Sequence, residues 1–126
     1  MGYFDHRSLR EVDQPMGACL LVRSTAAHEI GPMDDGNFPM FFNEVDWCLR
    51  LKQRGWTIFF NPRARAVHRH GASTARDRGS MIASSHQSLE RYLDKNFPRH
   101  PSAGAAKLLL KLALPIRRWW AARKAK

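Results

Sequence analysis

The sequence predicts a small α/β domain, on three observations. Apolar runs typical of short strands, at 17–23 and 56–60, alternate with segments of helical periodicity, at 24–30 and 43–54. Glycine and proline stand at the joints between these segments. The 126 residues, 44% of them hydrophobic, are enough for one modest core. Alternating strands and helices are typical of a fold in which helices cover a sheet.

The N-terminal part of the chain contains the first expected strand and helix. Residues 1–15 are polar and irregular, with a short extended piece expected at 10–13. The apolar run at 17–23 follows a glycine and predicts a buried strand. Ser24 is expected to cap a short helix that ends at the following Gly31-Pro32.

An aromatic-rich stretch leads into the helix on which the site prediction depends. If this helix begins at residue 43, steps of about 100° place Glu44 on one stripe with Cys48 and Leu51. Glu44 is therefore expected to point inward, and Asp46 to be a surface partner of Arg50. The alternative for Glu44 is an acid placed in the first turn because it interacts favourably with the helix dipole. A glycine at position 55 is expected to end the helix.

The middle and end of the chain continue the pattern. Residues 56–60 and 64–68 predict two strands, and residues 80–96 predict a helix with Met81, Ile82, Leu89 and Leu93 on its buried side. The core, or else the wall of a binding cleft, is the place expected for four aromatic residues: Trp47, Trp56, Phe59 and Phe60.

The last segment, 99–126, is a basic tail rich in alanine and leucine. Pro115 is expected to interrupt it, and two tryptophans stand among lysines and arginines. This composition suits an amphipathic helix on an anionic membrane surface, and it suits a solvated basic tail equally well. The expected organisation is an irregular segment at 1–15, a domain at 16–98 and the tail at 99–126.

The charge and the cysteines limit the partners and the compartment. A net charge of +10 predicts an anionic partner, either a phosphate-bearing substrate, a membrane surface or nucleic acid. Nucleic acid is the least favoured of these, because the basic residues are dispersed and match no known binding motif. Cys19 and Cys48 lie in apolar segments without a CxxC spacing, which favours buried thiols in a cytoplasmic protein over a disulfide or a zinc site. No apolar signal core is visible.

Several segments also recur in the order and spacing of a known family. They are Glu11-Val-Asp13, Met16-Gly-Ala-Cys-Leu-Leu-Val-Arg23, Phe41-Phe-Asn-Glu-Val-Asp-Trp-Cys-Leu-Arg50, Gly55-Trp56, Val67-His68, Gly71-Ala-Ser-Thr74 and Ser85-His-Gln-Ser-Leu89. Over about residues 9–97 the chain resembles the C-terminal half of family 2 inverting glycosyltransferases, in the rhamnosyltransferase-like branch of bacterial polysaccharide assembly. The order of the motifs carries the resemblance, since no single motif is specific.

The resemblance implies a GT-A fold, with a mostly parallel sheet flanked by helices. It further implies inverting transfer of a sugar from a nucleotide-sugar donor to a saccharide or lipid-linked acceptor. In that family the acidic residue at the place of Glu44 is the general base, and the histidine at the place of His68 helps to bind a divalent metal, Mg²⁺ or Mn²⁺, or the donor diphosphate. Other residues expected to bind donor or acceptor are Gly17, Ala18, Asp46, Trp47 and Arg76.

Each of these residues also has a structural interpretation. Gly17 and Ala18 could serve only to begin a strand, and Arg76 could belong to a solvated run of charges. His68 and His70 lie two apart, which is a weak signal for a metal site because no third ligand is evident.

Two departures from the family pattern concern the site. Glu44 stands where the family usually has aspartate, and no Asp-x-Asp metal motif occurs in the sequence. In the family that motif belongs to the N-terminal half. The chain is therefore expected to be part of a glycosyltransferase, inactive without a separate N-terminal half, and cytoplasmic or peripheral on the inner face of the cell membrane. The alternative is a non-catalytic basic module that binds a membrane surface or nucleic acid.

Overall fold

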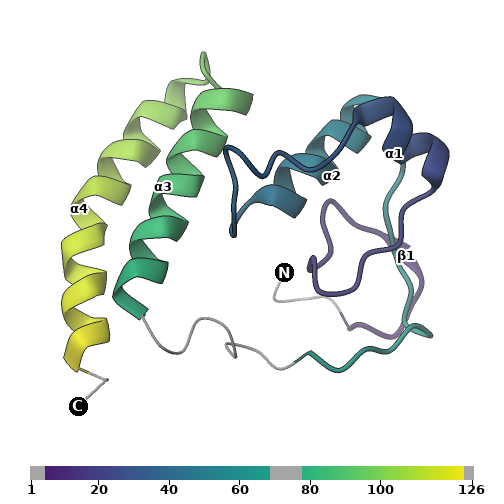
Figure 1. Ribbon diagram of the computed structural model, residues 1–126, viewed down its shortest axis with the longest axis horizontal. Helices are drawn as coiled ribbons and strands as arrows, with labels where there is room; N and C mark the ends of the chain where they lie inside the picture. The colour runs from purple at the N-terminus through teal and green to yellow at the C-terminus, as the bar shows by residue number, and fades with distance from the viewer. Residues whose placement is uncertain (1–4, 69–77, 124–126) are drawn as a thin grey trace. The chain divides into compact units, whose positions relative to one another are not determined.

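The computed structural model describes residues 5–68 and 78–123, which fall into two compact units (Figure 1). Unit 1 comprises Met1–Asp34 and Asn43–Arg69, and unit 2 comprises Asp35–Phe42 and His70–Lys126. The elements, in chain order, are β1 (Arg10–Glu11), α1 (Ser24–Ile30), α2 (Asn43–Gln53), β2 (Phe59–Phe60), α3 (Arg78–Asn96) and α4 (Pro101–Arg123). The GT-A fold remains a prediction.

Unit 1 contains a short antiparallel sheet. β1 pairs with β2, with Arg10 opposite Phe60, and the N–H of Val12 extends the pairing by donating to the carbonyl of Ile58 at 2.9 Å. The extended piece at 10–13 and a strand within 56–60 are thus confirmed.

The strands expected at 17–23 and 64–68 are wrong. Both segments lack regular secondary structure, and each has a large apolar side chain that is almost fully exposed, Leu21 at 98% and Val67 at 99%. A short apolar run becomes a strand only where neighbouring strands pair with it. No strand pairs with either run among the residues that the structure describes.

The core of unit 1 lies between α1, α2 and the chain that precedes β2. Its buried members are Ala26, Cys48, Leu51 and Ile58, and Val12, Val22, Ile30 and Trp56 pack against them. The inward positions of Cys48 and Leu51 are confirmed. The expectation of two buried thiols is wrong for Cys19, which is exposed, and Phe59 is 55% exposed and outside the core.

Both helices of unit 1 end at glycine, as expected. Gly31 and Gly55 have φ angles of 75° and 82°, and their N–H groups donate to Ala27 and Lys52 carbonyls, each at 3.0 Å. Ser24 is the first residue of α1 instead of its cap, because Arg23 occupies the N-cap position without a side-chain hydrogen bond.

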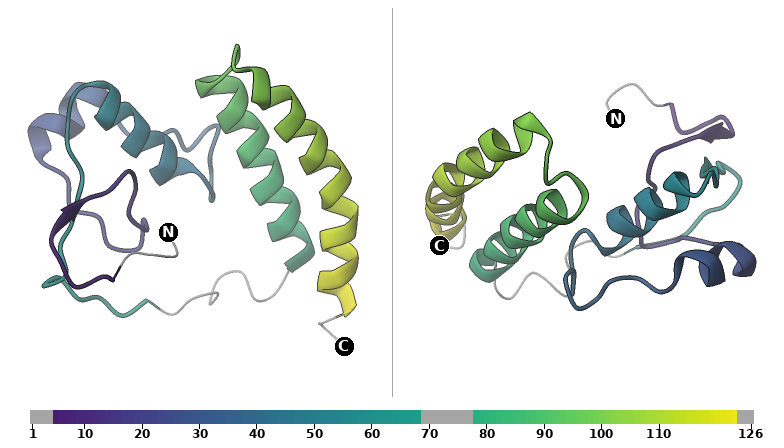
Figure 2. Two further views of the ribbon diagram at one scale, coloured as in Figure 1. Left: turned by 180° about the vertical axis from the view of Figure 1, so that it is seen from behind. Right: turned by 90° about the horizontal axis from the view of Figure 1, so that it is seen from above.

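Unit 2 is built on two long helices. α3 and α4 run side by side in opposite directions in every view (Figures 1 and 2). An ion pair of 2.6 Å joins Lys107 Nζ to Asp94 Oδ1 near the connection between the helices. The segment before α2 belongs to this unit, because the fully buried Phe38 packs edge-on against Tyr92 at 6.4 Å between ring centroids.

Two expectations about unit 2 need correction. The helix at 80–96 is confirmed, but the four residues expected on its buried side are only half-buried, and the residues that the structure buries on it are His86 and Ser88. The interruption at Pro115 is wrong, since α4 continues through it. Pro115 is exposed, so its ring does not obstruct the packing of α4 on α3. Proline has no N–H to donate to the preceding turn, and the helix continues despite this loss. No helix within 5–68 or 78–123 has both the length and the apolar character needed to cross a bilayer.

Candidate functional site

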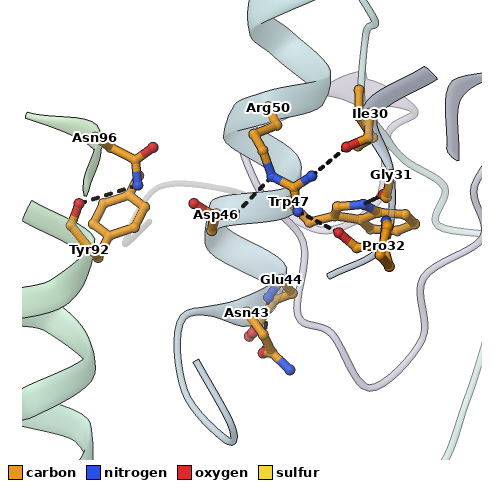
Figure 3. A network of polar contacts seen from close by, with 10 residues as sticks. All are labelled: Ile30, Gly31, Pro32, Asn43, Glu44, Asp46, Trp47, Arg50, Tyr92 and Asn96. Carbon is orange, nitrogen blue, oxygen red and sulfur yellow. Dashed lines mark hydrogen bonds and ion pairs between the residues drawn. The ribbon is translucent and has the colours of Figure 1, made fainter. Parts of the chain in front are cut away.

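The first turn of α2 carries Glu44, the predicted general base. Its side chain is half-buried, and its backbone N–H donates to Asn43 Oδ1 at 2.9 Å (Figure 3). Within the residues that the structure describes, the Glu44 carboxylate takes part in no hydrogen bond or ion pair. Both of its oxygens therefore have lone pairs available for an incoming hydroxyl.

Asp46, two residues later, is in the opposite situation. Its side chain is fully buried, and Arg50 Nε donates to Asp46 Oδ2 at 2.9 Å. The predicted partnership with Arg50 is confirmed, but the predicted surface position is wrong. A helical projection predicts which residues share a face of the helix. It does not predict whether the rest of the protein covers one face or both. Because the Asp46 carboxylate is buried and already accepts a charge-assisted bond from Arg50, it suits a positioning role.

Arg50 and Trp47 hold the turn that follows α1. Arg50 Nη1 and Nη2 donate to the carbonyls of Ile30 at 2.6 Å and Pro32 at 2.8 Å. Between them, Trp47 Nε1 donates to the Gly31 carbonyl at 2.8 Å (Figure 3). Side chains of α2 thus satisfy three successive carbonyls at the C-terminal end of α1 and in the turn after it, which fixes the helix that carries Glu44. Sequence reasoning missed this network, although the Gly-Pro turn after a helix signals carbonyls that need donors.

Gly17 lies against the side chain of Glu44. A Cβ atom at position 17 would be 3.2 Å from Glu44 Cβ and Cγ and 3.3 Å from Cδ. That is tighter than most contacts a real Cβ makes, so a hydrogen atom fits where a methyl group would push on the carboxylate arm. The structure therefore brings together two of the residues predicted for one site. Ala18, also predicted, is exposed in the adjoining turn, and Arg76 lies outside the described residues.

The chain enters α2 through a strained residue. Phe42, two positions before Glu44, has a φ angle of 70°, in the left-handed region. For a bulky L-residue this conformation costs about 1–2 kcal/mol. Strain of this kind is commonly found at functional sites, where the surrounding structure maintains it.

The pKa of the Cys48 thiol is affected by the charge of Glu44. Burial raises the pKa of the Cys48 thiol above its usual range, and the negative charge of Glu44 raises that pKa further. Cys48 is therefore a protonated thiol at neutral pH, which leaves it suited to packing beneath Glu44.

The described residues do not make up a metal site. No group of three His, Cys, Asp or Glu side chains close enough to share an ion occurs within 5–68 and 78–123. His68 is exposed and stands at the end of the described part of unit 1, in a stretch without regular secondary structure. A divalent ion needs more protein ligands than this one histidine supplies.

Sequence comparison relates this chain to glycosyltransferases. It is 37% identical over 86 residues to the N-acetylglucosaminyl-diphospho-decaprenol L-rhamnosyltransferase of Mycobacterium tuberculosis, in two strains. The match covers 68% of this chain and 28% of the relative. An uncharacterized protein of Sinorhizobium fredii, y4gI, is 26% identical over 73 residues, which cover 57% of this chain and 8% of that protein.

The comparisons are limited in extent. The chain spans less than a third of the length of the curated relatives it matches. No family model matches it, and no solved structure matches it. What the similarity supports is a glycosyltransferase relationship at the general level.

Proposed function

We propose that the chain is part of an inverting glycosyltransferase and that Glu44 is its general base. The observation that carries the proposal is the 37% identity to a rhamnosyltransferase over 86 residues. By analogy with that relative's name, the donor would be a nucleotide-activated deoxyhexose such as rhamnose, and the acceptor a sugar linked to a lipid diphosphate. The remaining binding residues would come from a part of the enzyme that this chain does not cover.

In the proposed reaction, the acceptor hydroxyl lies against the Glu44 carboxylate. As its oxygen bonds to the anomeric carbon of the donor, the proton passes to Glu44 and the nucleoside diphosphate leaves from the opposite face. The open coordination of Glu44 supports this role, because a base must have a free lone pair within reach of the hydroxyl.

The other predicted site residues take supporting roles in this proposal. Asp46, through Arg50, and Trp47 hold α2 against the 30–32 turn, and Gly17 leaves room for the Glu44 side chain. His68 is proposed for the donor diphosphate side, where an imidazole could donate a hydrogen bond to an oxyanion. A divalent metal, if one takes part, would need other ligands.

A chimera tests the proposal directly. Residues 9–97 replace the matching region of the mycobacterial rhamnosyltransferase, and rhamnosyl transfer is followed with the relative's substrates. We expect transfer by the chimera, and a loss of 10²-fold or more in kcat for Glu44→Gln at unchanged stability, as removal of a general base typically gives. Glu90→Gln, in α3, is the matched control and should keep its activity.

Two results would count against the proposal. A folded chimera without transfer would contradict the function itself. A Glu44→Gln chimera with turnover within about threefold of the parent would remove Glu44 from the role of base.

A further inference from the structure

The helix α4 has two apolar faces. One packs on α3 and consists of buried or half-buried residues, namely Ala103, Ala106, Leu110, Ala113 and Leu114. The other face is exposed and consists of six large side chains that are each 49–66% exposed: Leu108, Leu109, Leu112, Ile116, Trp119 and Trp120. At about 100° per residue, these six share roughly a third of the helix circumference. We call them the outer face.

Polar contacts fix the orientation of α4 on α3. The ring of the buried His86 contacts the Leu110 carbonyl through Nδ1 at 3.3 Å, and Arg117 Nη1 donates to His86 Nε2 at 3.1 Å. Both contacts are satisfied when the His86 proton resides on Nδ1. Rotating α4 to bury the outer face would break them, so the outer face remains directed away from α3.

Cations accompany the outer face, and anions do not. From Pro101 to Lys126 the chain has seven lysines and arginines and no aspartate or glutamate. Lys111 and Arg118 lie on one flank of the outer face, between it and the face that packs on α3. At the end of the helix the Arg123 guanidinium lies 3.8 Å from the centre of the Trp119 ring.

We propose that α4 is an interfacial helix that binds the surface of an anionic lipid bilayer through its outer face. The leucines, the isoleucine and both tryptophans would enter the boundary between headgroups and acyl chains, while the flanking cations meet lipid phosphates. Nucleic acid would satisfy the cations and leave six large apolar side chains in water. The inference stands without the proposed transferase activity.

Vesicle binding by the full 126-residue chain tests this. Co-sedimentation is measured with phosphatidylcholine vesicles that contain about 30% phosphatidylglycerol and with pure phosphatidylcholine. We expect at least tenfold tighter binding to the anionic vesicles, and a loss of this preference at high salt, because each cation near the surface contributes about fivefold. Equal binding to both vesicles, or binding to neither, would overturn the proposal.

A matched pair of triple variants identifies the binding face. The variant Leu108→Gln, Leu112→Gln and Ile116→Gln should bind at least about 100-fold more weakly, since three apolar side chains no longer leave water. The control replaces three exposed apolar residues of unit 1 with glutamine. They are Leu9, Leu21 and Val67, which are 65%, 98% and 99% exposed. It should bind within about threefold of the parent. Glutamine keeps the helix propensity of α4, which far-UV circular dichroism checks. Equal losses in both variants would exclude a specific outer face.

Two further measurements separate lipid from other occupants. Quenching of tryptophan emission by brominated lipids should disappear in the Trp119→Phe, Trp120→Phe variant, because Trp47 and Trp56 belong to unit 1. Persistent quenching would move the contact to unit 1 and overturn the proposal. Sedimentation velocity tests whether a second copy of the chain covers the outer face. A parent chain that forms a dimer and does not bind vesicles, together with an outer-face variant that is a monomer, would show this and overturn the proposal. Binding to an RNA duplex without binding to vesicles would likewise overturn it.

Discussion

The helices α2 and α4 differ in the way in which the protein holds them. α2 is short, its apolar stripe is buried, and two of its side chains donate hydrogen bonds to the 30–32 turn. α4 is twice as long, packs on α3 through one face, and leaves the outer face exposed. Directional bonds hold α2 in one position, as the proposed role of Glu44 would require. α4 instead presents an apolar surface with cations beside it.

Loss of the Arg50 bonds should have the largest effect. Arg50→Met removes the ion pair with the fully buried Asp46 and leaves two turn carbonyls without the Arg50 donors. Breaking a buried pair typically costs about 3–5 kcal/mol in the free energy of unfolding, and we expect a value at the low end because Arg50 is 22% exposed. Urea unfolding followed by tryptophan fluorescence measures it.

Trp47→Phe is the matched control for Arg50. It removes one neutral hydrogen bond, to the Gly31 carbonyl, and keeps an aromatic ring, so a loss of about 1 kcal/mol is expected. If Arg50→Met and Trp47→Phe reduced the free energy of unfolding equally, the Asp46–Arg50 ion pair would contribute no more than the single Trp47 hydrogen bond.

Pro115 offers the opposite test, in α4. Proline inside a helix is about 3 kcal/mol less favourable than alanine, so Pro115→Ala should raise the free energy of unfolding of unit 2 by up to that amount. Unit 1 should be unaffected if the two units unfold separately. Helix content from far-UV circular dichroism and a thermal scan measure the change. A lower melting temperature would show that the proline shapes the packed face of α4.

The sequence predicted the helices better than the strands. The helices α1, α2 and α3 were expected within a few residues, because glycine or proline follows each of them and apolar periodicity marked them. The segment that forms α4 was expected to be interrupted at Pro115, and the structure shows one continuous helix. The runs at 17–23 and 64–68 were misread because strand formation depends on partners elsewhere in the chain, which composition does not reveal.

The site was predictable in its members and not in its geometry. Glu44 and Gly17 came from motif order, and the structure adds that they touch. Periodicity placed Asp46 on the surface, whereas the structure buries it beside Arg50. Local periodicity alone could not anticipate that Arg50 would reach across to a turn eighteen to twenty residues away.

Gly17→Ala tests how precisely the Glu44 carboxylate must be placed for sugar transfer. Its Cβ would press on the flexible arm of Glu44, so we expect a change in stability below about 0.5 kcal/mol and roughly tenfold slower transfer by the chimera. The matched control is Glu90→Gln in α3, which lies within the exchanged region and should keep full activity. Equal activity in the two variants would mean that the site tolerates the shift.

The smallest expected effect is on the reactivity of the two thiols. Cys19 is exposed and should react readily with a thiol reagent, whereas Cys48 should react slowly because it is buried and its pKa is raised. In a Cys19→Ser background, the pH dependence of the reaction follows the ionisation of the Cys48 thiol.

The charge of Glu44 should be visible in this titration. Because a nearby carboxylate disfavours the thiolate, Glu44→Gln should lower the pKa of Cys48 and move its reaction to lower pH, while Glu11→Gln, outside α2, should not. A raised pKa also means that the folded state holds this proton more tightly than the unfolded chain does. Its contribution to stability is therefore complete below the usual thiol range and is lost as the pH rises through the raised value. If Glu44→Gln left the reaction profile of Cys48 unchanged, Glu44 would not be the ionised neighbour that the proposed base requires.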